Sequence, residues 1–241
     1  MRIRYDRTYR IRLYVAIIFM IILYVFTAYT KNNRSLNVIE MLNIFMASRP
    51  FVVVLPAIVS MLCSDISLED LTSRNIYLVL QRSSRTRYIM SRLSEIVLMS
   101  LLFVAATFIM CNLVTIIMTG SVSWYGIITE KTVAYTEQLF KRLLVFFVFC
   151  VTWGCIGSFF AIVFRNRSAG YVFPFIISYL LMWLRENYLK DLDVIDPSFW
   201  LSDVLMTGGN STQLFLSMIL VFITVVISYY LYLFREISRR E

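Results

Sequence analysis

The sequence contains no histidine among its 241 residues, and this absence excludes several kinds of chemistry. Histidine is the usual general base near neutral pH, a frequent zinc ligand and a member of the Ser-His-Asp triad. The four cysteines (Cys63, Cys111, Cys150 and Cys155) lie inside apolar runs and have no CxxC spacing. We therefore interpret them as small buried apolar residues and not as metal or redox centres.

Glycine and charged residues are also scarce. None of the seven glycines precedes a lysine, so the GxxxxGK[ST] loop that holds ATP phosphates is missing. The apolar runs contain no paired carboxylates. The longest stretch outside them, Ser64 to Leu93, is shorter than the about 50 residues that an independent domain needs. We expect no enzymatic activity in this chain, and the idea of an intramembrane enzyme has no residues to support it.

What the sequence has instead is apolar residues in long runs. Hydrophobic residues make up 59% of the chain and charged residues 16%, whereas soluble domains are about half apolar and about a quarter charged. A membrane-spanning helix needs about 20 mostly apolar residues. We predict an all-α integral membrane protein with one transmembrane domain, residues 1–241. Its six spans lie at about 13–30, 41–63, 94–119, 142–164, 169–184 and 213–234.

The sequence leaves the start of the second span open. Phe51 to Cys63 is too short alone, so we expect the helix to extend back through MLNIFMASRP, with Pro50 and Pro56 kinking or restarting it. Residues 36–50 either belong to this span or lie on the outer surface.

The arginines predict the orientation. With the N-terminus inside, fifteen of the 23 Lys and Arg residues are on the inner side: five before Leu13, five between Ser73 and Arg92, Arg165 and Arg167, and three after Phe234. All fifteen are arginine, and the four lysines are all outside. Because an excess of Lys and Arg marks cytoplasmic loops, we predict that both termini are cytoplasmic in a multi-pass protein of the cell membrane.

The N-terminal stretch MRIRYDRTYRIR precedes the first span without a small-x-small cleavage site after that span, so we expect the span to be retained. We interpret residues 1–12 as a basic interfacial segment whose arginines bind lipid phosphates. These arginines are Arg2, Arg4, Arg7, Arg10 and Arg12.

Two further segments suggest contacts between helices. Gly154 and Gly157 place small residues on one helix face, which suits close packing either within the subunit or against a second one. The outer segment YLKDLDVIDPSFWLSDVLMTGGN mixes aspartates with aromatic residues, and it predicts an interfacial or re-entrant helix begun by Asp196-Pro197-Ser198 and ended by Gly208-Gly209.

The connector between the second and third spans is acidic at its start and basic at its end. Ser67, with Asp70 three residues later, resembles a capping box. We predict a short cytoplasmic helix from there through NIYLVLQR, interrupted at Ser83 and Ser84. Glu95, just inside the third span, is expected to form a salt bridge with Arg92 or Arg87.

At this connector the chain resembles the permease subunits of ABC-2 type ABC transporters. The residues that carry the resemblance are Asp65, Glu69 and Asp70; Ser73-Arg74-Asn75; Ile76 to Leu80; Arg82-Ser83-Ser84-Arg85; and Tyr88 to Arg92. A basic N-terminal segment, six spans and Asp-Pro-x-x-Trp before the last span are similar too. The chain departs from the family where Arg74-Asn75 replaces the customary glycine and Arg92 the closing lysine.

The resemblance implies a bacterial ABC export permease that dimerises, with itself or with a different permease, and binds separate ATPase subunits. This chain would hold no cofactor, and ATP and magnesium would be bound by the partner. The surface that couples to the ATPase would include Asp65, Glu69, Asp70, Arg74, Tyr77, Arg82 and Arg85. Asp196, Pro197 and Trp200 would form the outer gate, and Gly154 and Gly157 a dimer face.

The small size of the chain suits a peptide-like or lipid-like amphipathic cargo, and the export of antimicrobial peptides or immunity to them is one use that would fit. The alternative is a structural or assembly membrane protein that transports nothing. Membrane lipids are expected partners in either case, and nucleic acids are not.

Overall fold

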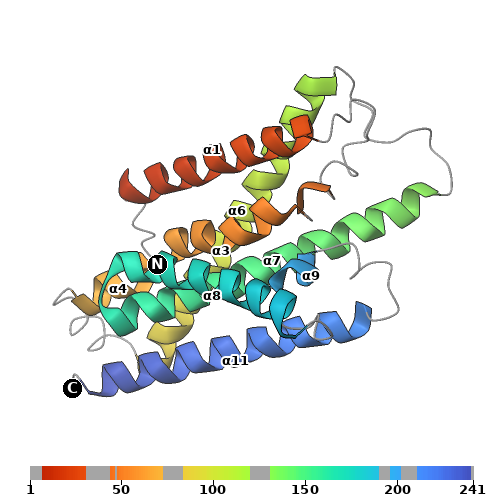
Figure 1. Ribbon diagram of the computed structural model, residues 1–241. Helices are drawn as coiled ribbons and strands as arrows, with labels where there is room; N and C mark the ends of the chain where they lie inside the picture. The colour runs from red at the N-terminus through yellow and green to blue at the C-terminus, as the bar shows by residue number, and fades with distance from the viewer. Residues whose placement is uncertain are drawn as a thin grey trace.

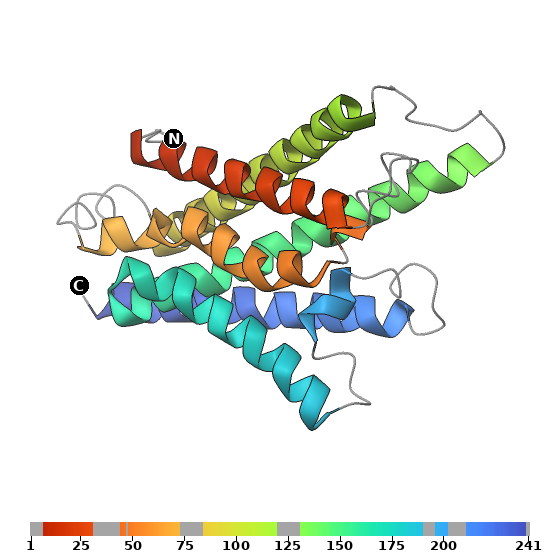
Figure 2. The same cartoon turned by 45° about the horizontal axis from the view of Figure 1, so that its top comes forward.

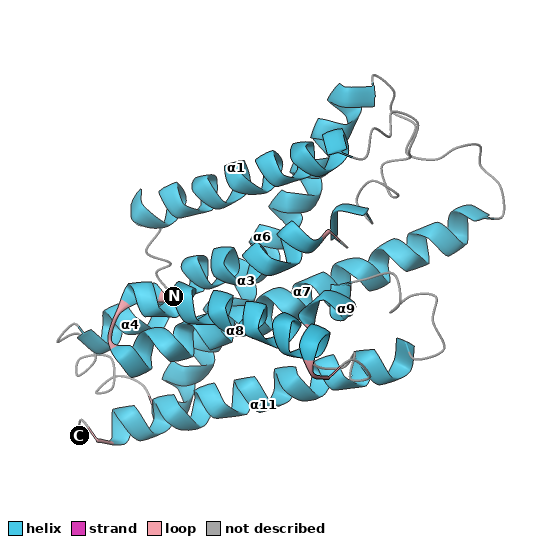
Figure 3. Cartoon of the chain, in the orientation of Figure 1, coloured by secondary structure: helices cyan, strands magenta, loops and turns pink. Residues whose placement is uncertain are grey.

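The computed structural model describes residues 7–30, 44–46, 48–72, 84–119, 131–189, 196–201 and 211–239. These residues are almost entirely helical, and no strand occurs among them (Figure 3). The all-α prediction is therefore confirmed for the described part of the chain. The helices are α1 (Arg7–Thr30), α3 (Arg49–Cys63), α4 (Asp65–Thr72), α6 (Arg85–Thr119), α7 (Lys131–Phe164), α8 (Arg167–Asn187), α9 (Pro197–Leu201) and α11 (Ser211–Ser238).

The long helices alternate in direction along the chain (Figures 1 and 2). Helices α1, α6 and α8 run away from the end of the molecule at which α11 finishes, and α3, α7 and α11 run back toward it. We call this the N/C end, because α1 begins there and α11 ends there, and we call the opposite one the loop end. Two termini on the same side of a membrane require an even number of spans, and this alternation of α1, α3, α6, α7, α8 and α11 is compatible with that prediction.

Among the described residues, five helices are long and apolar enough to cross a membrane: Arg49–Thr72, Arg85–Ile117, Phe140–Phe164, Arg167–Asn187 and Phe215–Ser238. They overlap the second to sixth predicted spans, so the chain has the helices of a multi-pass membrane protein. The apolar part of α1, Ile11–Thr27, falls short of 18 residues. Helix α1 begins at Arg7, so half of the predicted interfacial segment continues the helix of the first span instead of lying apart from it.

The second span differs from its predicted bounds at both ends. Helix α3 begins at Arg49 after Ser48, with Pro50 in its first turn, a position where the missing proline N–H costs no hydrogen bond. Residues 44–46 are helical as well, but the extended backbone of Ser48 separates them from α3. The predicted restart at Pro50 is therefore confirmed, and residues 36–43 and 47 lie outside the described residues. At the other end, Ser64 has helical backbone angles, and α4 follows without a break that would turn the chain. The predicted helix cap at Ser67 is wrong, because Ser67 lies inside α4.

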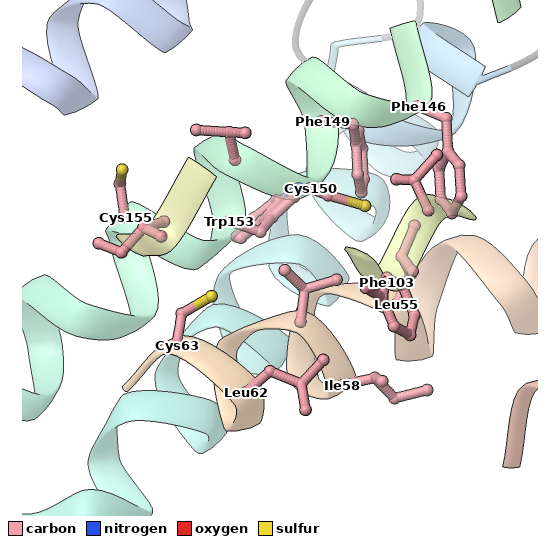
Figure 4. Packing of buried hydrophobic residues seen from close by; sticks show 14 of the residues in the cluster. Leu55, Ile58, Leu62, Cys63, Phe103, Phe146, Phe149, Cys150, Trp153 and Cys155 are labelled. Atoms are coloured by element: carbon pink, nitrogen blue, oxygen red, sulfur yellow. The ribbon is translucent and has the colours of Figure 1, made fainter. Parts of the chain in front are cut away.

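The core lies where α3, α6 and α7 meet (Figure 4). Leu55 and Cys63 of α3, Phe103 of α6, and Phe146 and Phe149 of α7 are all fully buried there. The rings of Phe103 and Phe146 are 6.4 Å apart, centroid to centroid. Figure 4 also shows three of the four cysteines among these apolar side chains. All four are buried free thiols, as the sequence predicts.

Gly154 and Gly157 allow close contact inside the chain. A Cβ atom on Gly157 would lie 2.5 Å from the Ser60 Cβ of α3 and 2.8 Å from the carbonyl oxygen of Gly170 on α8. A Cβ on Gly154 would lie 3.0 Å from the Cys63 sulfur. The sequence allows these glycines to pack either within the subunit or against a second one, and the structure shows packing within the subunit. This corrects the predicted dimer face, because α3 and α8 already cover it.

The turn between α7 and α8 is made without glycine. Arg165 ends α7 in the left-handed region, with φ of 50°. The side chain of Asn166 then accepts a hydrogen bond from the Ser168 amide and caps α8. Because only two residues separate the helices, α7 and α8 are adjacent and antiparallel, and the arginines on both sides of the turn lie at the N/C end.

Candidate functional site

Helix α4 is bonded to four other helices through polar side chains at the N/C end. The group consists of Asp65, Ser67, Glu69 and Asp70 on α4 with their partners Arg12, Tyr88, Arg92, Arg167 and Tyr229. We call this group the α4 junction. Because α4 continues α3 directly, its acidic side chains are held in the space between the ends of α1, α6, α8 and α11.

Asp65 is the most deeply buried charge of the α4 junction, with a side chain 1% exposed. Arg12 of α1 donates a hydrogen bond to its Oδ2 atom, and the Nε atom of Arg167 on α8 lies 3.7 Å from Oδ1. A buried carboxylate is tolerated when it is paired in this way. Asp65 therefore joins α4 to α1 and places α8 beside the same carboxylate.

Asp70 joins α4 to α6. Its Oδ2 atom accepts a hydrogen bond from the hydroxyl of Tyr88, at 3.1 Å, and forms an ion pair with Arg92. The guanidinium carbon of Arg92 also lies 5.2 Å from the centre of the Tyr88 ring, a cation–π distance. Arg92 pairs in addition with Glu95, with 2.5 Å between Nη1 and Oε2, as the sequence predicts.

Two neutral or more exposed contacts complete the α4 junction. Ser67 and Tyr229 of α11 share a hydrogen bond and are both buried. Glu69, which is 41% exposed, pairs with Arg167 at 3.2 Å. Within eight residues, α4 thus has polar bonds to α1, α6, α8 and α11.

The predicted coupling surface is only partly within the described residues. Asp65, Glu69 and Asp70 come together on α4. Arg85 lies at the start of α6, where Nη1 is 3.4 Å from the Ser238 hydroxyl of α11 and the guanidinium carbon is 5.8 Å from the Phe234 ring centre. Arg74, Tyr77 and Arg82 lie outside the described residues.

Among the predicted lipid anchors, Arg2 and Arg4 lie outside the described residues. Arg7 and Arg10 are part of the α1 helix, but their side chains are not among those described. Arg12 is about one-fifth exposed and pairs with Asp65. Its charge is therefore used at least in part for the contact between α1 and α4.

The predicted outer gate lies near the loop end, where α9 packs against α3, α7, α8 and α11. Asp196 starts α9, because its Oδ1 atom accepts a hydrogen bond from the Ser198 amide at 2.8 Å. Pro197 and Trp200 are buried, and the Trp200 ring centre is 6.3 Å from that of Phe149. The predicted start of this helix is confirmed, and Gly208-Gly209 lie outside the described residues.

Several partners in the α4 junction could not be selected from the sequence. Arg12 and Asp65 are 53 residues apart, and Ser67 and Tyr229 are 162 apart. Tyr229 lies in an apolar run with other aromatic residues, where an interfacial anchor is the ordinary interpretation. Acidic residues in an otherwise apolar helix were the only local signal, and that signal does not identify the partner.

The described part of the chain contains no group of three or more His, Cys, Asp or Glu side chains that could hold a metal ion. Comparison with protein-family models, with curated proteins and with solved structures finds no match for this chain. The resemblance to ABC-2 permeases therefore stays a prediction from the sequence.

Proposed function

We propose that this chain is the transmembrane permease subunit of an ATP-driven ABC exporter in the cytoplasmic membrane. Both termini would be inside, and α1 would cross the membrane together with the five longer apolar helices to give six spans. ATP and magnesium would bind to a separate ATPase, in two copies, and the permease would pair with a second permease. A peptide-like or lipid-like amphipathic cargo suits a chain whose apolar helices leave no room for an outer domain.

The α4 junction is the observation that carries this proposal. A subunit moved by an external ATPase needs a short element that the partner can displace and that is bonded to several spans. Helix α4 has bonds to four helices within eight residues. It also lies at the end with the arginine-rich connections, which the distribution of Lys and Arg predicts to be cytoplasmic.

The loop end supports the same function. Helix α9 packs against α3, α7, α8 and α11, and Trp200 is 4% exposed. The guanidinium carbon of Arg185 lies 4.4 Å from the ring centre of Phe199. A buried aromatic segment there would close the outer end of the bundle while α4 receives the force at the other end.

The first test is orientation. Thr72→Cys places a thiol on an exposed position at the N/C end, and Tyr188→Cys places one on a residue 70% exposed at the loop end. A membrane-impermeant maleimide added to intact cells is expected to label Tyr188→Cys and to label Thr72→Cys only after the membrane is opened. Labelling of Thr72→Cys in intact cells would place α4 out of reach of a cytoplasmic ATPase and end the proposal.

The second test is the partner. The tagged chain, extracted in mild detergent from its native membrane, is expected to co-purify with a subunit that carries GxxxxGK[ST]. Charge reversal by Arg85→Glu should weaken this association, whereas the matched reversal Lys141→Glu at the loop end should not. Recovery of the chain without an ATPase would favour the alternative, a structural or assembly protein of the membrane.

A further inference from the structure

Arg92 has two carboxylate partners that belong to different parts of the structure. Asp70 is on α4, across the contact between α4 and α6, whereas Glu95 is on α6 itself, three residues after Arg92. The three side chains are 20%, 25% and 21% exposed for Arg92, Asp70 and Glu95. The guanidinium is therefore mostly withdrawn from water and is shared by two acids.

Only one of these bonds would break if α4 separated from α6. Glu95 moves with Arg92 because both belong to the same turn of one helix, so their bond is independent of the position of α4. If Glu95 were absent, separation of Arg92 from Asp70 would leave a mostly buried guanidinium without an acid, and an unpaired buried charge is costly in free energy. Asp70 is near the end of α4 and is the most exposed of the three, so it can reach water after separation.

We infer that Asp70, Arg92 and Glu95 form a releasable latch: Asp70 holds α4 against α6, and Glu95 is the reserve partner that keeps Arg92 paired when α4 is released. Glu95 is a positioning residue in this arrangement. That an ATPase supplies the force to open the latch rests on the proposed function. The change of Arg92 from two acidic partners to Glu95 alone involves residues of this chain only.

The latch and a purely structural salt bridge predict opposite effects of Glu95→Gln. If Glu95 serves only to orient Arg92 toward Asp70, its loss weakens the Asp70 bond and α4 separates more often. If Glu95 stabilises the released state, its loss penalises that state and α4 separates less often. Asp70→Asn should increase separation under either view.

The experiment measures how often α4 separates in the purified chain, in lipid vesicles and without any ATPase. Leu71→Cys places a reporter thiol on α4, one residue after Asp70, at a position 3% exposed, and its reaction rate with a small permeant maleimide follows separation of α4 from the helices packed against it. Without Glu95, Arg92 still has Asp70 as a partner while α4 is held, but it has no acid once α4 separates. We therefore expect Glu95→Gln to slow this labelling about tenfold. Asp70→Asn should accelerate it.

Three controls make the result interpretable. Glu95→Asp keeps the charge and should restore much of the original rate, and Glu186→Gln removes a paired carboxylate at the loop end and should change nothing. Ile66→Cys, 6% exposed on α4, replaces the reporter if Leu71→Cys does not fold. Equal or faster labelling in Glu95→Gln overturns the latch. This outcome is separate from the search for a partner ATPase, because no ATPase is present in the vesicles.

Discussion

A methyl group added at Gly157 should destabilise the protein much more than one added at Gly154, although both residues lie on α7 three positions apart. At Gly157 the new Cβ would lie 2.5 Å from the Ser60 Cβ and 2.8 Å from the carbonyl oxygen of Gly170. That carbonyl is backbone and cannot turn away. At Gly154 the nearest atoms are side-chain atoms, the Cys63 sulfur at 3.0 Å and a methyl carbon of Ile96 at 3.2 Å.

The expected magnitudes follow from these contacts. Overpacking costs about 1–3 kcal/mol, and the rigid neighbours of Gly157 put it at the upper end. Alanine gains at most about 1 kcal/mol over glycine inside a helix. Gly157→Ala should therefore lower the free energy of unfolding by about 2 kcal/mol, whereas the two effects should nearly cancel in Gly154→Ala. For a chain of this size, that difference corresponds to about 5 °C in Tm.

Thermal unfolding in detergent, followed by tryptophan fluorescence, measures the difference directly. Gly170→Ala provides a second severe case, because its Cβ would lie 2.6 Å from the Ser64 Cβ and 2.9 Å from the Ala161 Cβ. The expected order of Tm is Gly154→Ala above Gly157→Ala and Gly170→Ala. Equal Tm values for all three variants would refute the close packing of α3, α7 and α8.

Three other changes have defined outcomes in the same unfolding assay. Asp65→Asn removes the charge that pairs with Arg12 and should cost about 2 kcal/mol. Trp200→Ala empties the space beside Phe149 and should cost about 3 kcal/mol. Arg165→Gly should raise stability by about 0.5–1 kcal/mol, because a left-handed φ strains any residue with a Cβ.

Each of these changes has a matched control. Glu186→Gln removes an acid whose partner is well exposed and should change Tm little, unlike Asp65→Asn. Trp183→Ala removes a tryptophan that is 43% exposed and should cost less than Trp200→Ala. Arg165→Ala loses the same surface pair with Glu236 but keeps the strain, so it should show no gain. A gain equal to that of Arg165→Gly would contradict the explanation by backbone strain.

The long apolar helices were predictable because an apolar run can be recognised without knowledge of contacts. Leu13–Thr30 and Gln213–Phe234 lie within α1 and α11, and the arginine-rich connections lie at the end where α11 finishes. Helix ends were less predictable. Apolar content defines where a helix can cross lipid, whereas α6 continues back to Arg85 through polar residues that no strong stop signal interrupts.

The α4 junction was only half predictable. Acidic residues at 65, 69 and 70 indicated a functional segment, but Ser67 was interpreted as a helix cap because its spacing to Asp70 suits one. Its actual partner, Tyr229, comes from α11. The spacing of residues along the sequence does not indicate a contact between residues so far apart. The same holds for Arg12, whose charge looked suited to lipid phosphate until the fold placed Asp65 beside it.

The serines of the central helices restrict which parts of the bundle can slide. The Ser60 hydroxyl donates to the Trp153 carbonyl at 2.9 Å, and the Ser158 hydroxyl donates to the Cys63 carbonyl at 2.8 Å. One bond has its donor on α3 and the other has its donor on α7, so the two helices are joined by a reciprocal pair of hydrogen bonds. Gly157 and Gly170 let α8 pack closely beside them. A translation by even one residue would separate both donors from their acceptors within an apolar interior. Any sliding between the helices of this bundle would then occur along helices other than the α3–α7 pair.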